Sequence, residues 1–197
     1  MKITSAEFET SAPNLDACPR RVLPEFAFIG RSNVGKSSLI NLLTERRELA
    51  MVSDLPGKTK LINFYIINRR WSLVDLPGYG YAHVRQTERT AFNAAVAEFL
   101  EERDNLVRVF VLIDSRLPPQ AIDLEFVRWL GHSHPNYALI FTKSDKQSST
   151  QSQSNIALFK AKLGEWRTEM PEIFLCSSKN KKGRTEIIAS IAQALGE

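Results

Sequence analysis

The sequence has few cysteines and no long hydrophobic run, and both shortages exclude classes of protein. Only Cys18 and Cys176 occur among 197 residues. Their spacing fits no metal-binding motif, and two cysteines are too few for a disulfide framework. No apolar stretch approaches the roughly 20 residues that a membrane-spanning helix needs. We therefore expect no membrane span, no structural metal and no dependence on disulfides.

The N-terminal segment lacks the pattern of a secretion signal. Residues 1–9 are polar and acidic and contain no apolar core of the kind that a signal peptide has. The cytoplasm is therefore the expected compartment. Hydrophobic residues make up 43% of the chain and charged residues 24%, a balance that favours a globular domain over a disordered chain. The length suits one α/β domain, and we find no internal repeat.

Basic residues exceed acidic ones slightly and occur in clusters. The net charge is +4 and the pI is about 9.1. The clusters are Arg20–Arg21, Arg46–Arg47, Lys58 with Lys60, Arg69–Arg70, and Lys179, Lys181, Lys182 and Arg184. They fit either solvated loops or a surface that contacts a polyanion such as RNA. Composition does not decide between these two interpretations.

Apolar patterns predict a layered α/β fold. Residues 1–24 are interpreted as an N-terminal extension with one short strand near 3–8, and residues 25–197 as a single domain. Further strands are expected at 25–29, 61–67, 71–74, 107–113, 137–141 and 173–176, and helices at 35–44, 87–103, 118–131, 156–166 and from 187 onward. The Ser/Gln-rich stretch 147–154 is interpreted as a polar loop. A hairpin followed by alternating strands and helices predicts three layers around a mostly parallel, doubly wound sheet with one antiparallel strand.

The pattern Gly, four residues, Gly-Lys-Ser begins at Gly30 and has the form of a phosphate-binding loop. An apolar strand pattern precedes it and a helical pattern follows it. Glycines allow a tight turn, and successive N–H groups at a helix N-terminus favour anions. In such a loop Lys36 reaches the β- and γ-phosphates, and the Ser37 hydroxyl can ligate Mg²⁺.

Polar residues that follow other strands extend this site, because ligands bind at the carboxyl ends of the strands in a doubly wound sheet. Asp75 can hold Mg²⁺, usually through water, and Gly78 can offer a backbone N–H to a γ-phosphate. Thr59 follows the long loop 45–58, and its hydroxyl can complete the Mg²⁺ shell when a triphosphate is bound. The plainer interpretations are a turn aspartate and a threonine that starts a strand.

The segment Thr142-Lys143-Ser144-Asp145 follows the next predicted strand but one. A carboxylate accepts hydrogen bonds from N1–H and the 2-amino group of guanine, and adenine has no such pair of donors. Asp145 would therefore select guanine, with the Lys143 stem along the base. After the last predicted strand, Ser177-Ser178-Lys179 can offer a backbone N–H to the guanine O6 atom.

Four segments together resemble the EngB family of bacterial GTPases, within the translation-factor-related P-loop GTPases. They are Phe28 to Asn41, Pro56 to Thr59, Asp75-Leu76-Pro77-Gly78-Tyr79-Gly80-Tyr81-Ala82 and Thr142 to Asp145. The resemblance implies a P-loop GTPase domain that binds GTP or GDP with Mg²⁺ and hydrolyses GTP slowly. It also implies association with the large ribosomal subunit or its precursor, and a requirement in normal cell division and septation. We expect a monomer.

The motif positions imply a set of nucleotide-binding residues. These are Gly30, Arg31, Ser32, Asn33, Val34, Gly35, Lys36, Ser37, Ser38, Gly57, Lys58, Thr59, Asp75, Leu76, Pro77, Gly78, Thr142, Lys143, Ser144, Asp145, Ser177, Ser178 and Lys179. Within the set, Ser37, Thr59 and Asp75 are the expected metal ligands. Lys36, Thr59 and Gly78 are the expected catalytic groups.

Two positions differ from the small signalling GTPases. Those proteins place a water-orienting glutamine directly after the Asp-x-x-Gly segment, where this chain has Tyr79. We therefore expect very slow intrinsic turnover that a partner raises. Asn33 lies where related GTPases with an asparagine can bind K⁺ beside the phosphates, although an asparagine also suits the loop geometry. His83 is a weaker candidate for a general base.

Two other functions remain open at this stage. An ATPase or ATP-dependent kinase also uses a phosphate-binding loop, but Asp145 argues against adenine. An RNA-binding module with a vestigial nucleotide site would explain the basic clusters, but the intact Lys36 and Ser37 argue against it.

Overall fold

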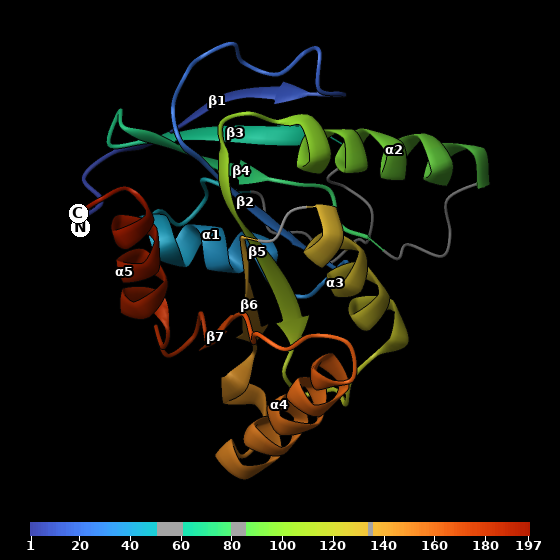
Figure 1. Cartoon of the computed structure of the whole chain (residues 1–197). Helices are drawn as coiled ribbons and strands as arrows, with labels where there is room; N and C mark the ends of the chain where they lie inside the picture. Colours follow the sequence, from blue (N-terminus) through green and yellow to red (C-terminus); the bar gives the residue numbers. More distant parts are fainter. Residues whose placement is uncertain (51–60, 80–85, 134–135) are drawn as a thin grey trace.

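The computed structural model describes residues 1–50, 61–79, 86–133 and 136–197 (Figure 1). In chain order the elements are β1 (Ala6–Ala12), β2 (Glu25–Gly30), α1 (Lys36–Thr44), β3 (Ile62–Ile67), β4 (Trp71–Asp75), α2 (Gln86–Glu102), β5 (Leu106–Asp114), α3 (Ala121–Ser133), β6 (Tyr137–Thr142), the short 3₁₀ helix η1 (Ser144–Lys146), α4 (Ser149–Gly164), β7 (Glu172–Leu175) and α5 (Arg184–Ala194). The helices of this described part are too short or too polar to cross a bilayer.

The strands form one sheet in the order β1-β3-β4-β2-β5-β6-β7. β3 pairs antiparallel with both β1 and β4, and the other neighbours pair in parallel. β3 is therefore the one strand of this sheet that runs opposite to the rest. The predicted mostly parallel sheet with one antiparallel strand is confirmed.

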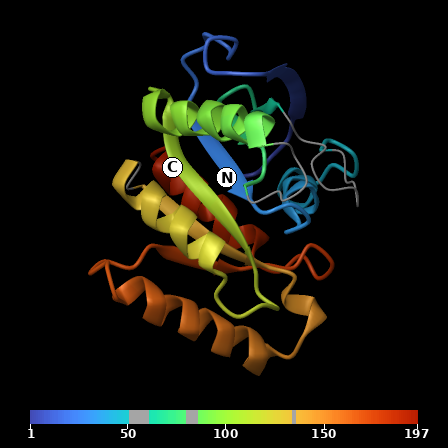
Figure 2. The same cartoon turned by 90° about the vertical axis from the view of Figure 1, so that its right-hand side faces the viewer.

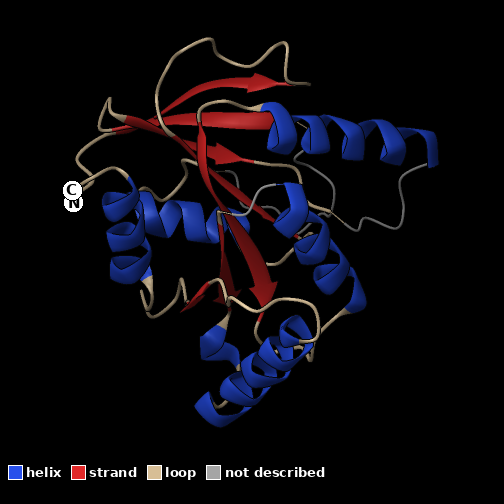
Figure 3. Ribbon diagram, in the orientation of Figure 1, coloured by secondary structure: helices blue, strands red, loops and turns tan. Residues whose placement is uncertain are grey.

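Helices cover both faces of the sheet, as Figure 3 shows with helices in blue and strands in red, and an apolar layer lies on each face. Phe26 and Phe28 of β2 pack in the layer beneath α1 and α5. Ala27 and Ile29 point to the other face and pack beneath α2, α3 and α4, which lie next to one another in Figure 2. This alternation follows from the two-residue period of a strand, and it explains why β2 is buried along its whole length.

The first strand lies later in the chain than the sequence indicated. The structure places it at Ala6–Ala12 rather than near 3–8, and it pairs with β3 at the sheet edge. The reason is the Asn68 side chain, whose Oδ1 accepts the Thr4 N–H at 2.7 Å and whose Nδ2 donates to the Lys2 carbonyl at 2.7 Å. These bonds hold residues 2–5 against the β3–β4 turn, so that strand pairing starts beyond them.

The predicted polar loop at 147–154 is wrong for most of its length, because α4 begins at Ser149. Ser148 caps the helix, since its hydroxyl accepts the Gln151 N–H at 3.2 Å. Ser152 and Asn155 are buried and bond inward, with Asn155 donating to the Ser115 carbonyl at 2.8 Å. Polar side chains that bond to a neighbouring loop therefore replace the apolar stripe that usually marks a helix.

Parallel pairing brings the carboxyl ends of β2, β4, β5 and β6 to one edge of the sheet. In register, Asp75 lies beside Phe28, Gly30 beside Leu112, and Asp114 beside Thr142. Residues that follow these strands therefore meet at one place, as a ligand site in a doubly wound sheet requires.

Candidate functional site

The loop between β2 and α1 has the backbone shape of an anion site. Asn33 and Gly35 have φ angles of 61° and 103°, in the left-handed region, and Gly35 caps α1. Gly35 accepts from Leu39 at 2.9 Å, so the first intrahelical donor is Leu39. The N–H groups at the start of α1 precede that bond, and a helix leaves such groups without intrahelical acceptors. The loop can therefore direct N–H groups to a phosphate.

Lys36 and Asp75 form an ion pair below this loop. The Lys36 Nζ atom contacts Asp75 Oδ1, and both residues are buried, with 9% and 2% of their surfaces exposed. Lys36 lies at the start of α1 and Asp75 is the last residue of β4, so the pair ties the two candidate motifs together. An incoming phosphate would compete with Asp75 for the lysine cation.

The residues near this pair suit Mg²⁺. Ser37 is partly exposed in the first turn of α1 and supplies a hydroxyl, and Asp75 supplies a carboxylate. Mg²⁺ keeps several waters and takes one or two carboxylates together with substrate phosphates. A site of this kind needs no cluster of three acidic or histidine ligands, and the described residues contain none. The donor set therefore fits a metal that arrives with a nucleotide.

The Asp75–Gly78 segment lies directly against the phosphate loop. A Cβ atom on Gly78 would come within 2.7 Å of the Gly30 carbonyl oxygen and 3.3 Å of the Ser32 nitrogen. Only glycine allows this approach of two backbones. Leu76 donates to the Phe28 carbonyl at 3.0 Å, and Arg31 forms a parallel bridge with Tyr79. Strand-like contact between the two segments thus continues beyond the ends of β2 and β4.

Thr142 and Lys143 join the predicted base site to the phosphate loop. The Thr142 hydroxyl donates to the Val34 carbonyl at 2.6 Å, and Lys143 Nζ donates to the Asn33 carbonyl at 2.6 Å. Lys143 has a φ angle of 60°, which directs the chain into η1. These bonds join residues 108 and 110 positions apart in the sequence, so the two predicted motifs are held side by side.

Asp145 is oriented by the loop after β7. The Ser177 hydroxyl donates to Asp145 Oδ1 at 2.7 Å and accepts the Asn180 N–H at 3.1 Å. The hydrogen bond from Ser177 is the main reason that the pKa of Asp145 is lowered. Asp145 is partly exposed, and its second oxygen has no part in the Ser177 bond. The sequence predicted that a backbone N–H of Ser177-Ser178-Lys179 contacts the base; the Ser177 N–H donates to the Lys182 carbonyl at 3.1 Å, and the structure adds this role for the Ser177 side chain.

Five further predicted positions lie in the described part of the chain. Ser144 donates its N–H to the Cys176 carbonyl at 3.1 Å, and Ser178 and Lys179 are exposed in the loop after β7. Pro77 lines a cavity between α2 and α3. Ser38 lies in the first turn of α1. The predicted residues Gly57, Lys58 and Thr59, and the weaker candidate His83, lie outside the described residues.

Asp114 is a residue near this site that the sequence reasoning missed. It ends β5, and its Oδ2 accepts from Lys143 Nζ at 2.9 Å and from Arg116 at 2.7 Å. Burial alone would raise the pKa of Asp114, but the hydrogen bonds from Arg116 and Lys143 outweigh it and lower the pKa to about 2. Its signal was present, since an aspartate at a strand end followed by Ser-Arg matches the rule that located Asp75.

The lowered pKa of Asp114 predicts a pH-dependent contribution to stability. A carboxyl whose pKa falls on folding stabilises the protein above its unfolded pKa, near 4, and loses that contribution as the pH falls toward 2. We expect Asp114→Asn to lower the free energy of unfolding by about 2 kcal/mol at pH 6 and by roughly half as much at pH 3, where the folded carboxyl is still largely ionised. Urea unfolding of both proteins at pH 6, 4 and 3 measures this difference. A difference that stays constant with pH would contradict it.

The side chain of Tyr79 points away from the phosphate loop. Its hydroxyl donates to Asp123 Oδ1 at 2.9 Å, and its ring stacks on Phe126 at 4.2 Å between centroids. Both partners belong to α3. At the position where small signalling GTPases have a water-orienting glutamine, this chain thus has a side chain that is engaged elsewhere.

Comparisons with a family model and with related proteins point to the same family. Residues 25–143 match the family model described as 50S ribosome-binding GTPase. A probable GTP-binding protein EngB of Bacteroides thetaiotaomicron is 51% identical over 188 residues, which cover 95% of this chain and 93% of the relative. The corresponding protein of Christiangramia forsetii is 49% identical over 188 residues and covers 95% of each chain.

Solved structures share the fold at lower identity. The crystal structure of a probable GTP-binding protein EngB has a TM-score of 0.70 and 22% identity, and covers 86% of this chain and 97% of that one. Era, crystallised with MgGDPNP and a segment of 16S ribosomal RNA, has a TM-score of 0.68 and 19% identity, over 87% of this chain and 56% of Era. These likenesses confirm the predicted P-loop GTPase fold.

Proposed function

Because this chain belongs to the EngB family of GTP-binding P-loop GTPases, we propose that it is a GTP-controlled switch that acts on the large ribosomal subunit or its precursor. The match of residues 25–143 to the 50S ribosome-binding GTPases carries this proposal. The clustered basic residues support it, since a mild positive excess suits contact with ribosomal RNA. Under the proposal the chain acts in the cytoplasm as a monomer and is required for normal cell division and septation.

The arrangement of the site supports GTP as the ligand. The N–H groups of the Gly30–Ser37 loop would bind the phosphates, and Lys36 would exchange its contact with Asp75 for phosphate oxygens. The Asp145 carboxylate would accept the guanine N1–H and 2-amino hydrogens, one on each oxygen, since Oδ1 keeps a second lone pair beside the one that accepts from Ser177. Lys143 would lie along the base while Asp114 holds its ammonium group. The family's GTP binding would thus have donors for the phosphates and an acceptor for the guanine base.

Hydrolysis in this site would transfer the γ-phosphoryl group to water. The water oxygen bonds to the γ-phosphorus as the bond to the β–γ bridging oxygen breaks, giving GDP and phosphate. Lys36 and the Gly78 N–H would stabilise the charge that develops on the phosphate oxygens. Mg²⁺ bound through Ser37 and Asp75 would neutralise phosphate charge. Tyr79 bonds to α3, so the chain's own water-positioning group does not come from that position and slow turnover is expected.

Sedimentation with ribosomal particles tests the proposal. The full chain is mixed with purified 50S subunits or their precursors in GDP, in a non-hydrolysable GTP analogue, or without nucleotide. We expect at least about tenfold more protein bound with the analogue than with GDP, because a switch needs more than about 1.4 kcal/mol of coupling to be useful. The same particles should raise GTP turnover above that of the protein alone.

Purified 30S subunits serve as the control particle, since they carry comparable RNA charge. Equal binding to both subunits would indicate non-specific contact with RNA, whose affinity falls steeply with salt. Equal binding to 50S particles in all three nucleotide conditions would contradict the switch. Absence of any binding to 50S particles would contradict the proposed partner.

A further inference from the structure

Arg31, which is partly exposed, forms a cluster with the buried Tyr79 and Asp123 that joins three separate elements. Arg31 belongs to the phosphate loop, Tyr79 follows Gly78, and Asp123 lies in the first turn of α3. The Asp123 Oδ1 atom accepts from the Tyr79 hydroxyl at 2.9 Å and from Arg31 Nε at 3.0 Å. Asp123 is fully buried and Tyr79 is 8% exposed. One carboxylate oxygen therefore links the phosphate loop and the Asp75–Gly78 segment to the same helix.

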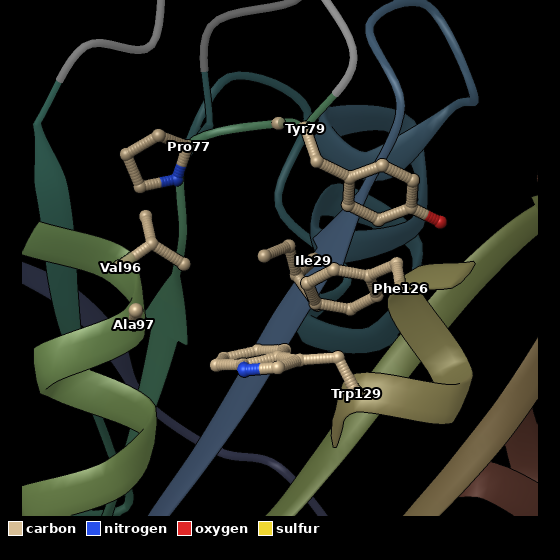
Figure 4. Close-up of a pocket in the computed structure, with 8 residues that line it drawn as sticks. Ile29, Pro77, Tyr79, Val96, Ala97, Phe126 and Trp129 are labelled. Atoms are coloured by element: carbon tan, nitrogen blue, oxygen red, sulfur yellow. The ribbon is translucent and has the colours of Figure 1, made fainter. Parts of the chain in front are cut away.

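The Tyr79 ring is fixed independently of its hydroxyl. It stacks on Phe126 with an interplanar angle of 15°. Figure 4 shows Tyr79 above Phe126 and Ile29, with Trp129 below them and Val96 and Ala97 of α2 on the opposite side. These residues line a cavity of about 230 Å³ that also contacts Pro77 and Gly78. Ring packing and hydrogen bonding thus hold the tyrosine at two points, and the cavity leaves room for motion if one of them is lost.

The cluster is costly for a purely structural contact. Burial raises the pKa of Asp123, although the Arg31 cation and the Tyr79 hydrogen bond oppose that rise. The second oxygen, Oδ2, has no hydrogen-bond partner within the part of the chain that the structure describes. A buried carboxylate with an unpaired oxygen stabilises a fold less well than apolar side chains of similar size. We therefore expect Asp123 to matter less for the stability of the fold than for the placement of the residues that it bonds.

What the cluster positions is Gly78. Tyr79 is covalently attached to Gly78, and the Gly78 backbone lies against the Gly30 carbonyl and the Ser32 nitrogen. We propose that Asp123 is a positioning residue for triphosphate recognition: through Tyr79 and Arg31 it holds the Gly78 N–H beside the phosphate loop, where a γ-phosphate would bind. The inference rests on the proposed function, since it takes GTP as the ligand of this loop.

The proposal separates the two nucleotides. We call the hydrogen bonds of Asp123 to Tyr79 and Arg31 the tether. GDP lacks the γ-phosphate, so its binding does not use the Gly78 N–H and does not depend on the tether. GTP binding uses that N–H, and a tethered Gly78 is already ordered before the nucleotide arrives. Without the tether, the Asp75–Gly78 segment becomes ordered only when GTP binds, and the entropy lost in that step lowers the affinity. Loss of the tether therefore lowers the preference for GTP over GDP while it leaves the fold and the base site intact.

The test uses Tyr79→Phe and Asp123→Asn in the full chain. The first variant removes only the hydroxyl and keeps the ring on Phe126, and the second keeps the shape of the side chain but removes its charge. Tyr137→Phe is the matched control, because Tyr137 is also a buried tyrosine and begins β6, at the end of that strand away from the phosphate loop. Dissociation constants for GDP and a non-hydrolysable GTP analogue are measured with Mg²⁺ for each protein, and thermal unfolding checks the fold.

We expect the ratio of GTP-analogue affinity to GDP affinity to fall roughly fivefold or more in both variants, with GDP affinity within about twofold of the parent, as the loss of a hydrogen bond to a charged group implies. Tyr137→Phe should leave the ratio unchanged. If the parent binds both nucleotides and the ratio in Tyr79→Phe is unchanged or increased, the positioning role of Asp123 is wrong and the proposed function still stands. Failure of the parent protein to bind either nucleotide would overturn the proposed function instead.

Discussion

Asp145→Asn is expected to weaken GTP binding by about a hundredfold or more and to create binding of xanthosine nucleotides. Under the proposed function, the carboxylate would accept both the N1–H and the 2-amino hydrogens of guanine. Asparagine keeps one acceptor but presents an NH₂ group in place of the second oxygen, and this donor would face the 2-amino donor. A site that must pair a polar group rejects a ligand that leaves it unpaired by several orders of magnitude. Xanthine has a carbonyl at that position and restores the match.

Competition binding with GTP, xanthosine triphosphate and ATP measures this exchange of specificity. Ser177 donates to Asp145 Oδ1 at 2.7 Å, and an asparagine oxygen can accept the same bond, so the variant side chain should keep its orientation. Asp104→Asn is the matched control, because it makes the same charge change at an exposed turn before β5, at the other end of the sheet. Parental GTP affinity in Asp145→Asn would refute guanine selection by this residue.

The strand-end residues could be predicted because local sequence and topology determine them together. An apolar run followed by glycines, or by Asp-x-x-Gly, marks the carboxyl end of a strand. Parallel pairing then brings such ends to one edge whatever their separation in the chain. The contacts of Lys36 with Asp75, and of Thr142 with Val34, show this directly. The rule applied equally to Asp114, which could have been identified in the same way.

Side-chain partners across the fold could not be predicted. Asp123 lies on α3 and meets Arg31 and Tyr79 over separations of 92 and 44 residues. Acidic residues are commonly found in the first turn of a helix, which is enough to explain an aspartate at this position. Nothing in the sequence therefore indicates that Asp123 also bonds to distant residues. The start of α4 was missed for a related reason, because Asn155 faces the protein interior through hydrogen bonds rather than through an apolar side chain.

Lys36→Met is expected to have two separate large effects. It removes the cation that would bind the phosphates, so nucleotide affinity should fall by about a hundredfold or more, since charge-assisted bonds to phosphate are among the strongest in a site. It also leaves Asp75 buried without its partner. Breaking a buried ion pair by removing one side costs about 3–5 kcal/mol, so the nucleotide-free protein should lose stability of that order.

The double variant Lys36→Met with Asp75→Asn separates these effects. Neutral asparagine removes the uncompensated charge, so most of the lost stability should return, whereas nucleotide binding should remain absent because neither change restores a cation. Urea unfolding without nucleotide and titration with GDP measure the two quantities independently on all four proteins of the cycle. Parental stability in the single Lys36→Met variant would show that the ion pair contributes little. Recovery of GDP binding in the double variant would show that Lys36 acts on the phosphates only by neutralising Asp75.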